Sequence, residues 1–151
     1  MKKPYSPLMR SLVVWYGLFQ AVHIFVNVRG LLQLAQGSID FPALPPPGGW
    51  SSQTIHFMTA MASLDLINAI LTLIFVYGFF KQTPWHVWLG TLTLTVSLYA
   101  ALIFDYVTWA SGAWPGNLPG YLFTNITFLP VILLFVLFSL KAAFWEIGRS
   151  E

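Results

Sequence analysis

The chain has 151 residues, of which 57% are hydrophobic and only 8% are charged, and its mean hydropathy is +0.71. A soluble domain carries about 25% charged residues, so this composition is typical of a membrane protein. The absence of cysteine excludes disulfides, thiolate catalysis and cysteine-ligated metal sites. The net charge of +2 is too small, and its basic residues too dispersed, to indicate a nucleic-acid partner.

Four apolar stretches are long enough to cross a bilayer, which takes about 20 residues. We expect transmembrane helices over residues 11–28, 54–80, 85–109 and 121–140, all within one domain, 1–151. The first stretch is long for a cleaved signal peptide, contains His23 and Asn27, and is followed by no A-x-A cleavage site. The sequence therefore predicts an all-α protein, a four-transmembrane-helix bundle whose first helix is retained.

The connecting segments predict the orientation of these helices. Basic residues gather before the first helix, in the tight turn 81–84 and in the C-terminal tail, whereas the two long loops, 29–53 and 111–120, contain only Arg29. The positive-inside rule then places both termini in the cytoplasm. His86, at the cytoplasmic end of the third helix, should be solvated. The proline-rich segment 41–50 has two interpretations of equal weight: it is a lid over a binding site, or it is a passive connector.

Polar residues occur at similar depths in all four stretches, in the middle-to-outer half of the membrane. Asp65 lies near the middle of the second stretch, where a carboxylate costs about 2.5–3.5 kcal/mol on insertion scales. The other polar residues at this depth are Gln20, His23, Asn27, Asn68, Asp105 and Asn125. Because polar groups in lipid face the bundle interior and partner one another, we expect one internal site that opens toward the outer side.

Most of these residues also have a purely structural interpretation. An intramembrane asparagine such as Asn68 or Asn125 often makes an interhelical hydrogen bond worth about 0.6 kcal/mol. His23 would bond a neighbouring helix, and Asp105 would be hydrated near the interface. Hydroxyl groups in the third helix are expected to bond their own backbone, namely those of Thr91, Thr93, Thr95 and Ser97. The structural interpretation is weakest for Asp65.

Three short patterns resemble the EXPERA superfamily, which includes the emopamil-binding protein, the sterol Δ8–Δ7 isomerases and the sigma-2 receptor. HIFVN (23–27) resembles H-x-x-x-E on the isomerases' first helix, and DLIN (65–68) resembles E-T-I-T on the next. NITF (125–128), followed by a proline, resembles N-x-x-W before a proline on the last helix. The turn FFKQTP and the segment IFDYVTWASG are also similar. The resemblance spans residues 23–140 and implies a four-helix core with a lipid pocket.

The resemblance implies a membrane-embedded isomerase that shifts a carbon–carbon double bond in a sterol-like or isoprenoid lipid without a metal or cofactor. Asp65 and His23 would be the catalytic pair, since a carboxyl group in apolar surroundings favours its uncharged form and an imidazole exchanges protons near neutral pH. The predicted ligand-binding residues are Asn27, Asn68, Asp105, Tyr121, Asn125 and Phe128. Three positions depart from the family: Asn27 replaces a glutamate, Asp65 a longer glutamate and Phe128 a tryptophan.

Three alternatives stay open. A non-catalytic protein of the sigma-2 receptor type would hold a sterol, lipid or cationic amphiphile, with ionised Asp65 pairing with a ligand amine. A haem-binding subunit of a membrane complex would use His23 and His56, although His56 lies about 180° around the helix from Asp65. A purely structural subunit would assign these residues no chemical role. The expected location is the endoplasmic reticulum of a eukaryote or the cytoplasmic membrane of a prokaryote, with the bilayer as partner and a homodimer left open.

Overall fold

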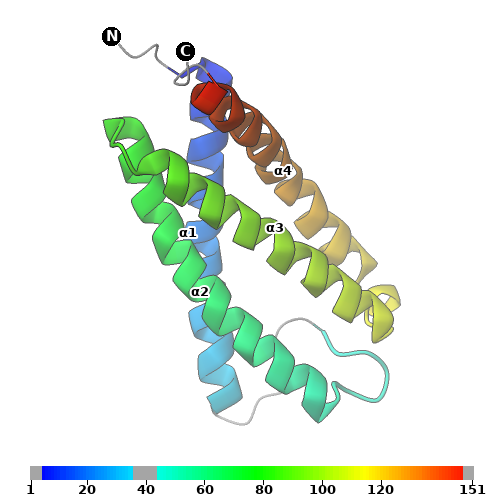
Figure 1. The fold of residues 1–151 in the computed structure, drawn as a ribbon. Helices are drawn as coiled ribbons and strands as arrows, with labels where there is room; N and C mark the ends of the chain where they lie inside the picture. The colour runs from blue at the N-terminus through cyan, green and yellow to red at the C-terminus, as the bar shows by residue number, and fades with distance from the viewer. Residues whose placement is uncertain (1–4, 36–43, 148–151) are drawn as a thin grey trace.

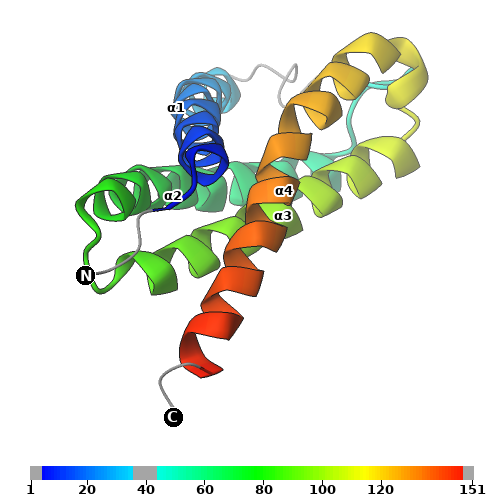
Figure 2. The same ribbon diagram turned by 90° about the horizontal axis from the view of Figure 1, so that it is seen from above.

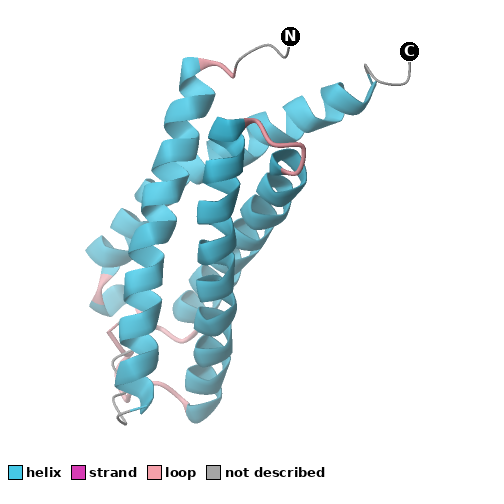
Figure 3. Ribbon diagram, turned by 90° about the vertical axis from the view of Figure 1, so that its left-hand side faces the viewer, coloured by secondary structure: helices cyan, strands magenta, loops and turns pink. Residues whose placement is uncertain are grey.

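The computed structural model describes residues 5–35 and 44–147, and the regular structure in that part of the chain is entirely helical (Figures 1 and 3). The elements are α1 (Pro7–Ala35), α2 (Ser52–Lys81), α3 (His86–Ala110), the short 3-10 helix η1 (Trp114–Gly116) and α4 (Leu118–Ile147). All four long helices are apolar and long enough to cross a membrane, and the span within α4 is Leu118–Lys141. The predicted all-α, four-helix membrane bundle is confirmed.

Two helices extend well beyond their predicted ends. α1 continues from Val28 to Ala35, and α4 continues from Leu140 to Ile147. The prediction ended each helix where hydropathy falls, but a fall in hydropathy does not interrupt backbone hydrogen bonding. The added segments contain leucine, alanine, arginine, glutamine and lysine, which are good helix formers. The first part of the proline-rich segment 41–50 lies outside the described residues.

Clear local signals set the ends of α2. Ser51 is its N-cap, and the Ser51 hydroxyl accepts a hydrogen bond of 3.1 Å from the Thr54 backbone N–H. Gln82 closes the helix in the left-handed conformation, with φ 51°, and its N–H bonds the carbonyls of the last turn. Gly78 lies against the Trp85 ring, where a Cβ atom would collide with the indole. This glycine therefore lets the chain reverse tightly into α3.

Each long helix packs against two neighbours: α1 and α3 both contact α2 and α4 (Figure 2). The α2–α3 turn, the beginning of α1 and the end of α4 lie at one end of the bundle (Figure 1), which is the end predicted to be cytoplasmic. α1 and α4 cross at an angle, and they diverge toward the end of the bundle that lies opposite the α2–α3 turn (Figures 1 and 2). The polar residues of interest lie in the half where these two helices separate.

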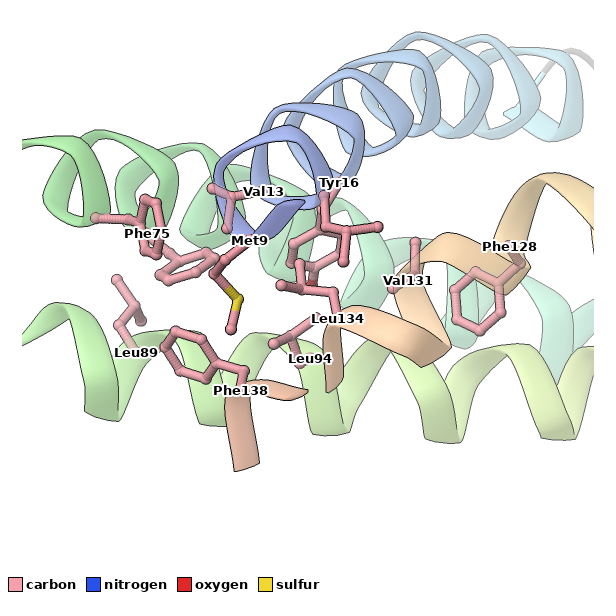
Figure 4. Close-up of a cluster of buried hydrophobic side chains, with 12 residues drawn as sticks. Met9, Val13, Tyr16, Phe75, Leu89, Leu94, Phe128, Val131, Leu134 and Phe138 are labelled. Carbon is pink, nitrogen blue, oxygen red and sulfur yellow. The ribbon is translucent and has the colours of Figure 1, made fainter. Parts of the chain in front are cut away.

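The main apolar core occupies the other half of the bundle (Figure 4). It combines side chains from all four helices: Met9, Leu12, Val13, Tyr16, Phe75, Phe79, Leu89, Leu94, Phe128, Val131, Leu134 and Phe138. Gly90 admits two of these rings, because a Cβ atom there would lie 2.5 Å from Phe75 and 2.8 Å from Phe138. Close packing of this kind is a principal force that holds helices together in lipid.

A hydrogen bond joins α1 to α4 beside a proline. Pro130 lies inside α4 and has no N–H to give to the preceding turn. The Trp15 indole N–H donates to the carbonyl of Thr127, in that turn, at 3.0 Å. The carbonyl that loses its helical donor at Pro130 is that of Ile126, so the Trp15 bond lies one residue beyond it. The bond thus fixes α1 against α4 near the middle of the bundle.

Candidate functional site

Asp65 is held by an amide from the neighbouring helix. Asn27 Nδ2, on α1, donates to Asp65 Oδ2, on α2, at 2.8 Å. Asn27 is 6% exposed, whereas Asp65 is half-buried. The expected interior partner of Asp65 is therefore present. An amide donates to either form of this carboxyl group, whereas a glutamate at position 27 would repel an ionised Asp65.

Ser97 is the centre of a second polar group, which we call the Ser97 cluster: Tyr16, Gln20, Asn68, Thr72 and Ser97. Its hydroxyl receives Gln20 Nε2 at 2.7 Å and Asn68 Nδ2 at 2.9 Å, and lies 2.8 Å from the Tyr16 hydroxyl. Thr72 also donates to the Tyr16 oxygen, at 3.1 Å. All five residues are buried. A single serine on α3 thereby connects α1 with α2.

The Ser97 cluster differs from what the sequence predicted. The backbone bonds expected of the helix-three hydroxyls are present for Thr91, Thr93 and Thr95. The prediction for Ser97 is wrong, because its hydroxyl bonds side chains of two other helices. Tyr16 and Thr72 were missed as well. Each lies four residues from a polar residue that was identified, Gln20 and Asn68, so the i, i+4 spacing was an available signal.

A third polar group joins α3 to α4. Asn125 Nδ2 donates to Asp105 Oδ1 at 3.1 Å and to the Tyr121 carbonyl at 3.0 Å. The Tyr121 ring stacks on Trp114, with centroids 5.2 Å apart, and packs beside Trp50. The described end of the proline-rich segment is thus buried against the start of α4. The Asp105 carboxylate accepts a hydrogen bond from a side-chain amide, as the Asp65 carboxylate does.

His23 lies on α1, four residues before Asn27, and packs against an aromatic side chain of the same helix. Its Nδ1 must carry a hydrogen, because it bonds the Phe19 carbonyl oxygen, at 3.0 Å. In the neutral ring, Nε2 is then an acceptor, and none of the described residues bonds it. The imidazole packs on the Phe19 ring at 4.3 Å, and Phe19 contacts Phe128 at 5.6 Å. The His23 imidazole therefore lies beside an aromatic surface.

Two buried oxygen atoms have unused hydrogen-bonding capacity. Gln20 Oε1 and the Tyr121 hydroxyl have no hydrogen-bond partner among the residues that the structure describes. Buried polar groups without a partner are uncommon in folded proteins. Gln20 belongs to the Ser97 cluster, and Tyr121 is bonded through its carbonyl to Asn125, the partner of Asp105. Both oxygen atoms therefore belong to residues that adjoin predicted ligand-binding residues.

The predicted site residues therefore fall into separate hydrogen-bonded groups. Asn27 and Asp65 form one pair, Asn68 belongs to the Ser97 cluster, and Asp105 with Asn125 forms another pair. The Asn68 side-chain NH2 group donates to the Ser97 hydroxyl and the Thr93 carbonyl, so its position fits a structural role. The residues with exposed surface in this region are Asp65, His23, Asp105 and Asn125.

The other two histidines lie elsewhere. His56 is exposed on α2, as its position around the helix predicted. The expectation that His86 is solvated is wrong, because it is 3% exposed. Tyr5 covers it and its hydroxyl lies 2.6 Å from His86 Nε2, while His86 Nδ1 bonds the Thr83 carbonyl. Within residues 5–35 and 44–147, no group of three or more histidine, cysteine or acidic residues is placed to hold a metal ion.

The comparisons with known proteins leave the family assignment as a prediction. No protein-family model matches the chain, and no solved structure matches it significantly.

Proposed function

We propose that the protein binds a sterol-like or isoprenoid lipid in the half of the bundle where α1 and α4 diverge, and moves a carbon–carbon double bond in it by proton transfer. The observation that carries this proposal is the arrangement around Asp65. One oxygen of this intramembrane carboxyl group is fixed by Asn27, while its other oxygen has no partner among the described residues. His23, with an acceptor nitrogen, precedes Asn27 by one helical turn, a rise of about 6 Å.

The reaction needs an acid, a base and stabilisation of a cation. Asp65 in its protonated form gives its proton to one alkene carbon, which leaves a carbocation on the adjacent carbon. His23 Nε2 takes a proton from the carbon on the far side of the cation, and the electron pair of that C–H bond becomes the new double bond. The imidazolium then returns a proton to Asp65. The aromatic faces of Phe19 and Phe128, next to His23, stabilise the cation.

The remaining polar groups suit the orientation of the ligand. Asn27 fixes the Asp65 carboxyl group without competing for its proton. The Tyr121 hydroxyl and Gln20 Oε1 are buried without a described partner, and they could bind a ligand hydroxyl only after the ligand displaces the side chains that cover them. Binding that aligns a reacting carbon with a fixed acid contributes strongly to rate, because it removes the entropic cost of bringing the groups together.

Binding without turnover is the second candidate function. It is favoured by the lack of a cationic partner for Asp65 among the described residues, because an ionised carboxylate in lipid is stabilised by pairing with a cation. In that case Asp65 pairs with the amine of a cationic amphiphile, and His23 contributes only to the shape of the site.

Deuterium incorporation separates the two functions. The purified protein is reconstituted with a panel of unsaturated sterols and isoprenoids in heavy water, and the recovered lipids are analysed by mass spectrometry. In heavy water Asp65 carries a deuteron before the lipid binds, so a single isomerisation turnover adds one deuterium to the product, whereas binding adds none. Asp65→Asn should abolish incorporation. Asp105→Asn, which alters the other described intramembrane carboxylate, should weaken binding but leave the deuterium content of each product molecule unchanged.

Each outcome has a defined meaning. Deuterated product from the unaltered protein and none from Asp65→Asn supports the isomerase. Lipid or amine that is retained unchanged, and lost in Asp65→Asn, supports the binding protein. Equal turnover by both proteins refutes the role of Asp65.

A further inference from the structure

An open groove lies beside the first turns of α1 and the last turn of α2, at the predicted cytoplasmic end and away from the Asp65 site. Its volume is about 400 Å³. It is lined by Arg10, Ser11, Val14, Trp15, Leu18 and Phe80. The five α1 residues lie on one helix face, because they recur at intervals of one turn. From the first to the last of them the helix rises about 12 Å.

The lining changes character along the groove. The guanidinium and hydroxyl groups of Arg10 and Ser11 lie nearest the start of α1, where the chain enters the membrane. Neither side chain has a hydrogen-bond partner or ion pair among the described residues. Deeper along the helix the lining is apolar, and its side chains are well exposed, from 41% for Trp15 to 61% for Leu18. A molecule that fits this pattern has a negatively charged head and an apolar tail.

We propose that this groove binds an anionic phospholipid. The Arg10 guanidinium presents donors in the fork geometry that matches a phosphate group, and the Ser11 hydroxyl adds one more donor. None of the six lining residues is acidic, so nothing in the groove balances the positive charge. A zwitterionic lipid carries its own cation close to its phosphate and so gains less from Arg10 than a lipid with net negative charge.

Lys81 is the control for the role of the groove, because it has the same charge as Arg10 but lies outside the lining. Lys81 follows the lining residue Phe80 in the chain and is exposed at the same end of the bundle, but it is not part of the lining. If surface charge alone attracted anionic lipid, Arg10 and Lys81 would contribute equally. If the groove binds the lipid, the contribution of Arg10 should exceed that of Lys81.

Native mass spectrometry of the full chain tests the proposal. The protein is equilibrated with equal amounts of phosphatidylglycerol and phosphatidylcholine of identical acyl chains. The unaltered protein should retain phosphatidylglycerol over phosphatidylcholine by about fivefold, the effect expected of one cation near a membrane surface. Arg10→Gln should remove most of this preference, Arg10→Lys should keep part of it, and Lys81→Gln should leave it nearly unchanged.

Two further measurements define the ligand class. Leu18→Trp fills the apolar part of the groove and should reduce retention of the lipid while Arg10 is intact. Inorganic phosphate in excess should not displace the lipid, because it lacks the acyl chains. The proposal is overturned if the two lipids are retained equally, if Lys81→Gln acts as strongly as Arg10→Gln, or if phosphate alone displaces the lipid. All of these readouts are independent of Asp65 and of isomerase activity.

Discussion

Replacing Ser97 by alanine should destabilise the bundle more than its small change in volume suggests. The substitution removes one hydroxyl group that bonds Gln20, Asn68 and Tyr16, in a cluster where Ser97 is 4% exposed. Interhelical hydrogen bonds in membranes contribute about 0.6 kcal/mol on average and about 1.7 kcal/mol at most. Loss of three such bonds should therefore cost about 2 kcal/mol, with about 5 kcal/mol as an upper limit.

The measurement is the free energy of unfolding in mixed micelles, followed by circular dichroism during denaturant titration. Ser63→Ala is the matched control, because the Ser63 hydroxyl is exposed and bonds only the Thr59 carbonyl of its own helix. This control should change stability by less than about 0.5 kcal/mol. If Ser97→Ala and Ser63→Ala have the same effect, Ser97 does not connect the three helices as described.

Two other substitutions test the packing of the helices. Gly90→Ala would bring a methyl group within 2.5 Å of a phenylalanine ring. It should lower the free energy of unfolding by about 1–3 kcal/mol, as overpacking does. Gly116→Ala, which has open space around it, should leave the free energy of unfolding nearly unchanged in the same assay. Trp15→Phe removes the hydrogen bond to the Thr127 carbonyl and should cost about 0.6 kcal/mol in addition to lost packing. A comparable loss from Trp88→Phe, which alters a 67% exposed indole on α3, would show that the bond contributes nothing.

The sequence was sufficient to predict the helices, because hydropathy and length constrain a membrane-spanning chain strongly. It was also sufficient to predict an interior partner for Asp65, since an isolated carboxylate in lipid is costly. It was less informative about helix ends, where α1 continues past Arg29. Arginine marks the membrane surface, but it does not end a helix.

The features that the sequence did not predict depend on contacts between segments that are distant in the chain. A serine in a helix usually bonds its own backbone, so nothing local distinguishes Ser97 from Thr95. The difference comes from Gln20 and Asn68, which meet Ser97 only after three helices have assembled. His86 was expected at the surface, and its burial depends on Tyr5, which lies 81 positions away in the sequence.

The Ser97 cluster also affects how the protein is made. Gln20 and its partner Ser97 are separated by 77 positions, whereas Asn27 and Asp65 are separated by only 38. At a synthesis rate of about 5–20 residues per second, the first pair must wait about 4–15 seconds for its second member, roughly twice as long as the other pair. During that interval the side-chain amides of Gln20 and Asn68 lack their partner on α3, so early release into lipid is unfavourable. The insertion machinery would therefore retain the first two helices until the third emerges, and shortening that delay should improve the yield of folded protein.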